Sequence, residues 1–198
     1  ALQELFAADA TIAVTDPVYP VYIDANAMAG RLGVYENGRW SKLTYLPCNK
    51  ENNFVPPLPE KRVDVVYLCY PNNPTGTVLT KEQLKKFVDW ALENEALIIY
   101  DAAYKAFITD DEIPFSIYQI PGADKCAIEC CSYSKTAGFT GTRCGYTVIP
   151  KALCFDGLNL NKMWGRRMSS KFNGVSYPVQ KAAEAIYTPE GQAQIEEC

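Results

Sequence analysis

The sequence predicts an α/β fold with three layers and a mainly parallel sheet, and three observations predict it. Short apolar runs rich in β-branched residues, such as VDVVYLCY at 63–70, are typical of strands that are buried on both faces. A stretch with helical spacing of its apolar residues separates that run from the next one, ALIIY at 96–100. Turn-forming residues, PNNPTGT at 71–77, mark the first change of element. Strands and helices that alternate in this way place helices on both faces of a parallel sheet.

The chain up to residue 70 is predicted to begin with the end of a helix, followed by a strand, a second helix and two more strands. The first strand stops at Asp16 and Pro17, and Gly30 and Gly33 stop the helix that follows. A proline-rich loop, NNFVPPLPEK, separates the last two strands. The predicted ranges are a helix over 2–8, a strand over 11–15, a helix over 18–28, and strands over 40–46 and 63–70.

The best-marked element after residue 70 is a helix over 81–93. Thr80 caps it, and Gln83 completes a capping box. Its apolar residues recur at helical spacing and are Leu84, Phe87, Val88, Ala91 and Leu92. The other predicted ranges are strands over 96–100, 126–132 and 145–149, helices over 159–169 and 177–187, and a helix that starts near the end of the chain.

Charge and composition exclude several classes of function. The 198 residues carry a net charge of −4 with no run of Lys or Arg, which argues against nucleic acid or an anionic membrane as partner. No apolar run approaches the roughly 20 residues that a transmembrane helix needs. The chain has no histidine, so Ser-His-Asp triads, Cys-His dyads and zinc fingers are excluded within it, and we expect no metal site.

The eight cysteines do not resemble a disulfide framework, because they form no CxxC pair. Five lie in or beside apolar, strand-like runs, where a free thiol packs as a small hydrophobe: Cys69, Cys126, Cys130, Cys131 and Cys144. We therefore expect free thiols and a reducing compartment, the cytoplasm.

Polar stretches follow four of the predicted strands. Ligands of open parallel sheets bind at the carboxyl ends of the strands. We therefore expect one site to be formed by residues 16–19, 72–76, 101–104 and 132–143.

Lys135 lies in SYSKTAGFTGTRCG at 132–145, directly after a predicted strand. A lysine that is partly desolvated can act as a Schiff-base nucleophile. Arg143 has the planar fork that binds phosphate, and Ser132 and Ser134 add hydroxyl donors. The alternatives are a solvated surface lysine and a weak surface ion pair of the arginine. An amine beside a phosphate cradle suggests pyridoxal 5′-phosphate as cofactor.

That cofactor requires further groups, and four candidates follow strand ends. Asp101, directly after ALIIY, can keep the pyridine nitrogen protonated, although a turn or helix cap is the alternative role. Tyr104 and Asn73 can donate to the phenolic oxygen of the cofactor, and Tyr19 can stack on its ring. Core packing explains either tyrosine equally well when it is considered alone.

Three motifs together resemble the fold-type I pyridoxal-phosphate aminotransferases of the aspartate aminotransferase superfamily. They are NNPTG at 72–76, DAAY at 101–104 and SYSKTAGFTGTRCG at 132–145, and their order and separations agree with that superfamily. Within it, the closer resemblance is to the LL-diaminopimelate aminotransferases. The stretches that carry it are DPVYPVYIDANAMAG at 16–30, KTAGFTGTRCGYTVIPK at 135–151 and KFNGVSYPVQKAAEAIYTPEG at 171–191.

The resemblance implies a role for each matched residue. Lys135 resembles the lysine that bonds to the cofactor and then moves a proton as general acid and base, and Asp101 resembles the partner of the pyridinium nitrogen. The implied catalytic residues are Lys135, Asp101 and Tyr104. The implied cofactor-binding residues are Tyr19, Asn73, Asp101, Tyr104, Ser132, Ser134, Lys135 and Arg143. The implied substrate-binding residues are Tyr19, Asn73 and Asn173, of which Asn173 reaches the partner subunit's site in a homodimer.

The resemblance covers essentially the whole chain, which matches the middle half of a family member. It implies that residues 1–198 are part of the large, cofactor-binding domain, truncated at both ends and without the C-terminal small domain. It also implies amino transfer from LL-2,6-diaminopimelate to 2-oxoglutarate in lysine biosynthesis, in the cytoplasm or the plastid stroma. Amino acids and 2-oxo acids are then the binding partners. The alternatives are an aspartate-type or aromatic aminotransferase or a carbon–sulfur lyase on the same fold and, in another class, a non-catalytic cofactor-binding domain or an inactive fragment.

Overall fold

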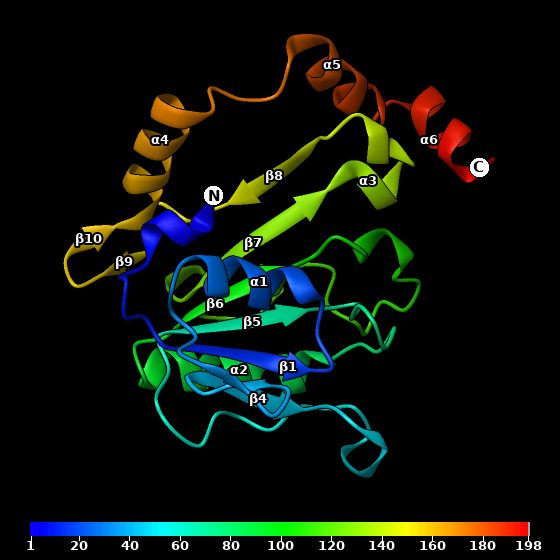
Figure 1. The fold of residues 1–198 in the computed structure, drawn as a ribbon. Coiled ribbons are helices and arrows are strands. Elements are labelled where there is room, and N and C mark those ends of the chain that lie inside the picture. The colour runs from blue at the N-terminus through cyan, green and yellow to red at the C-terminus, as the bar shows by residue number, and fades with distance from the viewer. Residues whose placement is uncertain (198) are drawn as a thin grey trace.

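The computed structural model describes residues 1–197, and a six-stranded sheet lies at its centre (Figure 1). The strand order is β4-β1-β5-β6-β7-β8, and every neighbouring pair is parallel except β7 and β8. The strands are β1 (Ile12–Asp16), β4 (Leu43–Pro47), β5 (Val65–Cys69), β6 (Leu97–Asp101), β7 (Ala127–Ser132) and β8 (Gly145–Val148). The prediction of an α/β fold with a mainly parallel sheet is confirmed.

Helices and two small ribbons complete the described part of the chain. The α-helices are α1 (Pro20–Met28), α2 (Lys81–Glu93), α3 (Tyr133–Thr136), α4 (Leu160–Lys171), α5 (Tyr177–Ala185) and α6 (Pro189–Glu196). The 3₁₀ helices are η1 (Leu2–Leu5), η2 (Lys50–Asn52), η3 (Lys105–Phe107), η4 (Ile117–Gln119), η5 (Ala123–Lys125) and η6 (Phe139–Gly141). The ribbons pair β2 (Tyr35–Glu36) with β3 (Arg39–Trp40) and β9 (Cys154–Phe155) with β10 (Leu158–Asn159).

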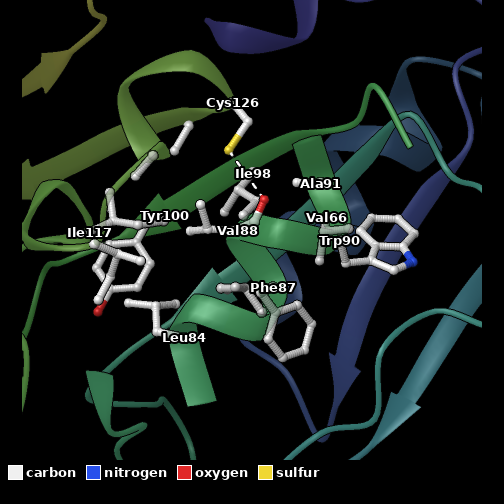
Figure 2. Close-up of a cluster of buried hydrophobic side chains, with 14 of the residues drawn as sticks. Val66, Leu84, Phe87, Val88, Trp90, Ala91, Ile98, Tyr100, Ile117 and Cys126 are labelled. Carbon is white, nitrogen blue, oxygen red and sulfur yellow. Dashed lines mark hydrogen bonds between the residues drawn. The ribbon is translucent and has the colours of Figure 1, made fainter. Parts of the chain in front are cut away.

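Helix α2 covers one face of the sheet with a closely packed apolar side (Figure 2). The predicted capping box starts the helix, since the Thr80 side chain accepts a hydrogen bond from Gln83 N–H and the Gln83 side chain accepts one from Thr80 N–H. Phe87 and Val88 are almost completely buried and lie in one cluster with Ile98 of β6. Full burial of one such side chain contributes about 1.5–3 kcal/mol. This packing anchors the central strands, whose ends carry the candidate residues.

A second apolar cluster lies on the opposite face, so the sheet is the middle of three layers. Alternate residues of a strand point to opposite faces, and in β6 Ile98 belongs to the first cluster and Ile99 to the second. Tyr22 of α1 and Leu160 of α4 pack into this second cluster with Val14 of β1. The predicted three-layer arrangement is confirmed.

Several element boundaries differ from the sequence prediction. The predicted strand over 40–46 is two strands, because the backbone turns at Ser41 and Lys42, whose N–H groups bond to the carbonyls of Val34 and Leu32. Trp40 therefore pairs with Tyr35 in a ribbon, and only the second part joins the sheet. Both ribbons and most of the 3₁₀ helices were absent from the prediction, since runs of two or three residues carry no periodic pattern.

The described cysteines are free, as predicted. Cys69, Cys126, Cys131 and Cys144 are buried, whereas Cys130 is partly exposed. Within residues 1–197, no helix has both the length and the apolar character to cross a membrane. Beyond β8 the chain leaves the sheet, and α4, α5 and α6 follow one another along its edge (Figure 1).

Candidate active site

The candidate residues cluster at the carboxyl ends of the parallel strands. The chain passes from β1 outward to β4 and then returns to the other side of β1 to form β5, β6 and β7. The order of the sheet therefore reverses between β1 and β5, and ligands of open α/β sheets bind at such a switch point. Tyr19 follows β1, and Asn73 follows β5. The expected meeting place of the four polar stretches is consistent with this topology.

Asp101, the last residue of β6, is held by two hydrogen bonds. The Tyr22 hydroxyl donates to Asp101 Oδ2 at 2.5 Å, and Ala103 N–H donates to Oδ1 at 3.0 Å. Burial and the negative charge of Asp101 raise the pKa of Tyr22 far above its usual range, so this hydroxyl stays protonated as a donor. The Tyr19 ring meets the Tyr22 ring edge-on, with 5.6 Å between centroids. Tyr19 and Asp101 are thus joined through Tyr22.

Tyr104 and Asn73 meet across the loops that follow β6 and β5. Asn73 Nδ2 donates to the Tyr104 hydroxyl at 3.2 Å. Asn72 is buried and shapes the NNPTG turn, because its carbonyl accepts from Gly76 N–H and its N–H donates to the carbonyl of Thr77. A pocket of about 410 Å³ opens at this point, lined in part by Asn73, Tyr104 and Phe107.

Lys135 lies in α3, the single helical turn that follows β7. Ser132 caps this turn, since its Oγ accepts from Ser134 N–H at 3.1 Å. The Lys135 Nζ lies 5.8 Å from the centre of the Tyr104 ring. Within the described part of the chain, no carboxylate lies at ion-pair distance from this amine. Lys135 is exposed, so the alternative of a solvated surface lysine stays open.

Arg143 lies in the loop between α3 and β8 and is exposed. Its guanidinium donates to the carbonyl of Thr140 at 2.6 Å, and the Thr140 hydroxyl donates to the carbonyl of Ser134 at 3.0 Å. Gly138 has a φ of 65°, and a Cβ added there would meet nothing within 4 Å. These two bonds fold the loop back toward α3, and both Gly138 and Arg143 are exposed.

Two groups of candidate residues are not in direct contact in this chain. Arg143 and the serines are joined through Thr140 and not directly. Asn173, which is exposed and follows α4, forms no hydrogen bond to another candidate residue within the described part of the chain. Its predicted place in a partner subunit's site stays a prediction.

Tyr22 is a member of the site that the sequence analysis missed. It lies 79 residues from Asp101 in the chain, so the contact depends on the order of the strands. The available signal was the repeat of tyrosine in DPVYPVY, which places Tyr22 one helical turn after Tyr19 and therefore on the same side of α1. Thr140 was missed too, and its role depends on loop geometry alone.

The side chains at this edge of the sheet bring four kinds of functional group together. They offer an amine, a half-buried carboxylate held by a tyrosine, a hydroxyl paired with an amide, and an exposed guanidinium. Within residues 1–197, no group of three or more Cys, Asp or Glu side chains is arranged to hold a metal ion.

Sequence comparison relates the chain to enzymes of amino transfer. A family model described as "Aminotransferase class I and II" matches residues 1–197. An LL-diaminopimelate aminotransferase of Bacteroides fragilis is 62% identical over 196 residues, which cover 96% of this chain and 48% of that protein. One from Desulfotalea psychrophila is 59% identical over 201 residues, with 99% of this chain and 49% of that protein covered. The chain spans about half the length of these relatives.

Solved structures agree with this relationship. The L,L-diaminopimelate aminotransferase of Chlamydomonas reinhardtii superposes with a TM-score of 0.93 at 44% identity, covering 98% of this chain and 50% of that one. The aminotransferase AspB of Helicobacter pylori superposes with a TM-score of 0.74 at 29% identity, covering 95% of this chain and 47% of that one.

Proposed function

The chain belongs to the class I and II aminotransferases, and from this premise we propose that the protein transfers the amino group of LL-2,6-diaminopimelate to 2-oxoglutarate. One observation carries the proposal. Lys135 lies near the ring of Tyr104, which is bonded to Asn73 and lies three residues after Asp101, the last residue of β6. The substrate pair is taken from relatives that are about 60% identical to this chain.

Pyridoxal 5′-phosphate is the proposed cofactor, and the residues present fit it. The Lys135 amine has no carboxylate partner within residues 1–197, so it is available to bond to an aldehyde carbon. Asp101 is fixed by two donors, and this carboxylate suits a protonated ring nitrogen. The exposed Arg143 guanidinium suits a phosphate, and Gly138 in the same loop has no side chain to block its approach. When bound, this cofactor supplies an electron sink for the pair left on the substrate's α-carbon.

Each candidate residue of the chain has a proposed role toward the cofactor or the substrate. Lys135 Nζ holds the cofactor and, once released from it, accepts the proton of the substrate's α-carbon. Tyr104 and Asn73 donate to the phenolic oxygen, and Tyr19 stacks on the ring. The phosphate ligands proposed are Ser132, Ser134 and Arg143. The substrate-binding residues proposed are Tyr19, Asn73 and Asn173.

The wider setting is part of the same proposal. Residues 1–198 form part of the large, cofactor-binding domain of such an enzyme. Asn173 reaches the site of a partner subunit in a homodimer, and its exposure and its lack of a hydrogen bond to another candidate residue within residues 1–197 leave it free to do so. The activity serves lysine biosynthesis in the cytoplasm, or in the plastid stroma of a plant or alga.

The cofactor assignment is tested by spectroscopy of the full-length protein with pyridoxal 5′-phosphate. We expect a visible absorption band that disappears in Lys135→Ala. A matched control is Lys85→Ala, which removes a partly exposed lysine of α2 and should leave the band intact. A Lys135→Ala protein with an unchanged band contradicts the role of that lysine.

The substrate assignment is tested with a panel of amino donors and 2-oxoglutarate, read as glutamate formed. We expect the highest kcat/KM with LL-diaminopimelate. Good rates with aspartate or aromatic amino acids and none with diaminopimelate would move the protein to another aminotransferase specificity. A bound cofactor without turnover of any donor would indicate a non-catalytic binding domain.

A further inference from the structure

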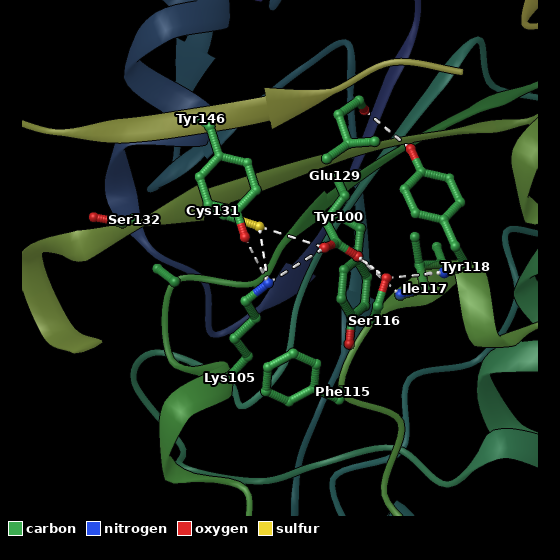
Figure 3. A network of polar contacts seen from close by, with 12 residues as sticks. Tyr100, Lys105, Phe115, Ser116, Ile117, Tyr118, Glu129, Cys131, Ser132 and Tyr146 are labelled. Atoms are coloured by element: carbon green, nitrogen blue, oxygen red, sulfur yellow. Dashed lines mark hydrogen bonds and ion pairs between the residues drawn. The ribbon is translucent and has the colours of Figure 1, made fainter. Parts of the chain in front are cut away.

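A second group of polar side chains lies beside the candidate site, around the amine of Lys105 (Figure 3). Lys105 is the residue directly after Tyr104 and the first residue of η3. Its Nζ lies 3.0 Å from the Tyr146 hydroxyl, 3.3 Å from Cys131 Sγ and 3.8 Å from Glu129 Oε1. The Phe115 ring covers the amine at 4.8 Å from its centre. The proposed function uses none of these five side chains.

Glu129 explains why a lysine is needed at this place. Its side chain is only 3% exposed, in the middle of strand β7. It accepts hydrogen bonds from the Ser116 hydroxyl at 2.6 Å and from Ile117 N–H at 3.0 Å. A buried carboxylate without a counter-charge is strongly destabilising. Lys105 is the one cation at ion-pair distance from Glu129 in the described part of the chain, so its amine is held at this point.

The protonation of Lys105 and Cys131 fixes which group donates in this cluster. Burial works to lower the pKa of Lys105, but its contacts with Tyr146 and Cys131 outweigh that effect, and the pKa is raised. Burial raises the pKa of Cys131, so Cys131 keeps its proton and donates to Glu129 Oε1 at 3.3 Å. Lys105 is therefore a charged donor to Tyr146 and Cys131 and the ion-pair partner of Glu129.

The cluster connects the Tyr104 loop to the strand that leads to Lys135. Cys131 lies on β7 four residues before Lys135, and it is paired with Tyr146 across β7 and β8. Lys105 bonds to the side chains of both. The backbone of Lys105 is joined to Tyr104 by one peptide bond, so the contacts that hold the Lys105 side chain also restrain the backbone that carries the Tyr104 ring.

We infer that the ion pair between Lys105 and Glu129 is a positioning device that sets the place of Tyr104 relative to Lys135. The inference rests on the proposed function, in which Tyr104 donates to the phenolic oxygen of the cofactor. Lys105 touches neither substrate nor cofactor, and it acts only through Tyr104. Loss of the pair lets the loop drift, and small misplacements of a catalytic group can reduce rates by about 100-fold.

The test uses the full-length protein loaded with pyridoxal 5′-phosphate and five variants, of which Tyr104→Phe is the reference for the spectral shift. Lys105→Met removes the charge at similar length, Glu129→Gln removes the carboxylate charge, and the double variant removes both. Lys85→Met is the matched control, because Lys85 pairs with Asp89 on the exposed side of α2. The measurements are kcat, KM, the midpoint pH of the visible spectral change, and the urea midpoint of the cofactor-free protein.

We expect kcat of Lys105→Met to fall about tenfold or more with KM changed less than about threefold, because Tyr104 is displaced and not removed. The spectral midpoint should shift in the direction that Tyr104→Phe shifts it, and by less. The double variant should regain much of the urea midpoint, since no uncompensated charge stays buried. It should not regain kcat or the spectral midpoint, because the anchor of Tyr104 is still missing.

Two results overturn the inference. One is a Lys105→Met protein whose kcat and spectral midpoint match those of Lys85→Met. The other is a double variant in which kcat and the spectral midpoint recover together with the urea midpoint, which would show a role in stability alone.

Hydrogen exchange of the cofactor-free protein separates this inference from the proposed function. In Lys105→Met, amide exchange over residues 102–108 should accelerate relative to Lys85→Met. If the wild-type protein binds no cofactor, the proposed function fails. The anchoring role of Lys105 is tested separately, and it is overturned if amide exchange over residues 102–108 is the same in Lys105→Met and Lys85→Met.

Discussion

The hydrogen bond between Tyr22 and Asp101 makes the most specific prediction about the candidate site. Tyr22→Phe removes one hydroxyl and keeps the ring, which is 8% exposed and stacks on Tyr67 with 5.1 Å between centroids. No cavity is expected, so the change isolates the 2.5 Å bond to Asp101 Oδ2. A hydrogen bond to a charged group contributes about 1.5–3 kcal/mol. The folding equilibrium should therefore fall roughly 10- to 140-fold.

The assay is urea unfolding of the cofactor-free protein at pH 7. Tyr35→Phe is the control, because Tyr35 is 59% exposed and its hydroxyl makes no hydrogen bond within residues 1–197. We expect the control to change the free energy of unfolding by less than about 0.5 kcal/mol. A loss of that small size in Tyr22→Phe would refute the reasoning that this bond holds Asp101 in place.

Three further predictions concern stability. Burial works to raise the pKa of Asp64, but hydrogen bonds from Thr11 outweigh that effect, and the pKa is lowered. The Asp64 carboxylate therefore stabilises the folded protein above its ordinary pKa of 3.8, and this stabilisation is lost in stronger acid. Asp64→Asn should thus cost about 1 kcal/mol at pH 7 and almost nothing near the acid limit of folding, and a difference constant with pH contradicts this. Phe87→Ala should cost about 3–5 kcal/mol in urea unfolding because the residue is 2% exposed, and a loss below about 1.5 kcal/mol would mean that the core behind α2 collapses around the gap. Gly145→Ala places a Cβ 2.6 Å from a backbone oxygen of β7 and should lower the melting temperature, whereas Gly165→Ala in α4 meets nothing within 4 Å and should not; equal effects would argue against the close β7–β8 contact.

Much of the fold could be predicted because the signals are local. Helix α2 was predicted with its observed bounds, since the capping box and the apolar spacing both lie within the helix itself. The main strands were found from β-branched apolar runs, with ends shifted by at most three residues. The Trp40 region failed because a two-residue ribbon and a turn read as one alternating strand.

The candidate site was predictable only in outline. The rule for parallel strands indicated that Asn73, Asp101 and Lys135 lie at one edge, and the sheet order agrees. The contacts themselves depend on tertiary structure. Tyr22 lies in α1, which follows β1, and only β5 separates β1 from β6 in the sheet. Tyr22 therefore reaches Asp101 at the end of β6, although the two residues are 79 positions apart in the chain.

Glu129 shows a different limit of sequence reasoning. A glutamate inside the apolar run CAIECC predicts a buried carboxylate, which needs a cation nearby. The sequence does not say which cation supplies it. Lys105 does so because η3 follows β6, the strand next to β7, and Tyr146 and Phe115 close around the amine.

The central claim is that the amine of Lys135 carries pyridoxal 5′-phosphate at the carboxyl edge of the sheet. Its most direct test is borohydride reduction of the full-length protein loaded with the cofactor, followed by digestion and mass spectrometry of the peptides. Reduction makes the link between lysine and cofactor stable to digestion, so the labelled residue can be read directly. We predict one labelled site, Lys135, and none in Lys135→Ala. A label on another lysine, or label retained in Lys135→Ala, would contradict the account.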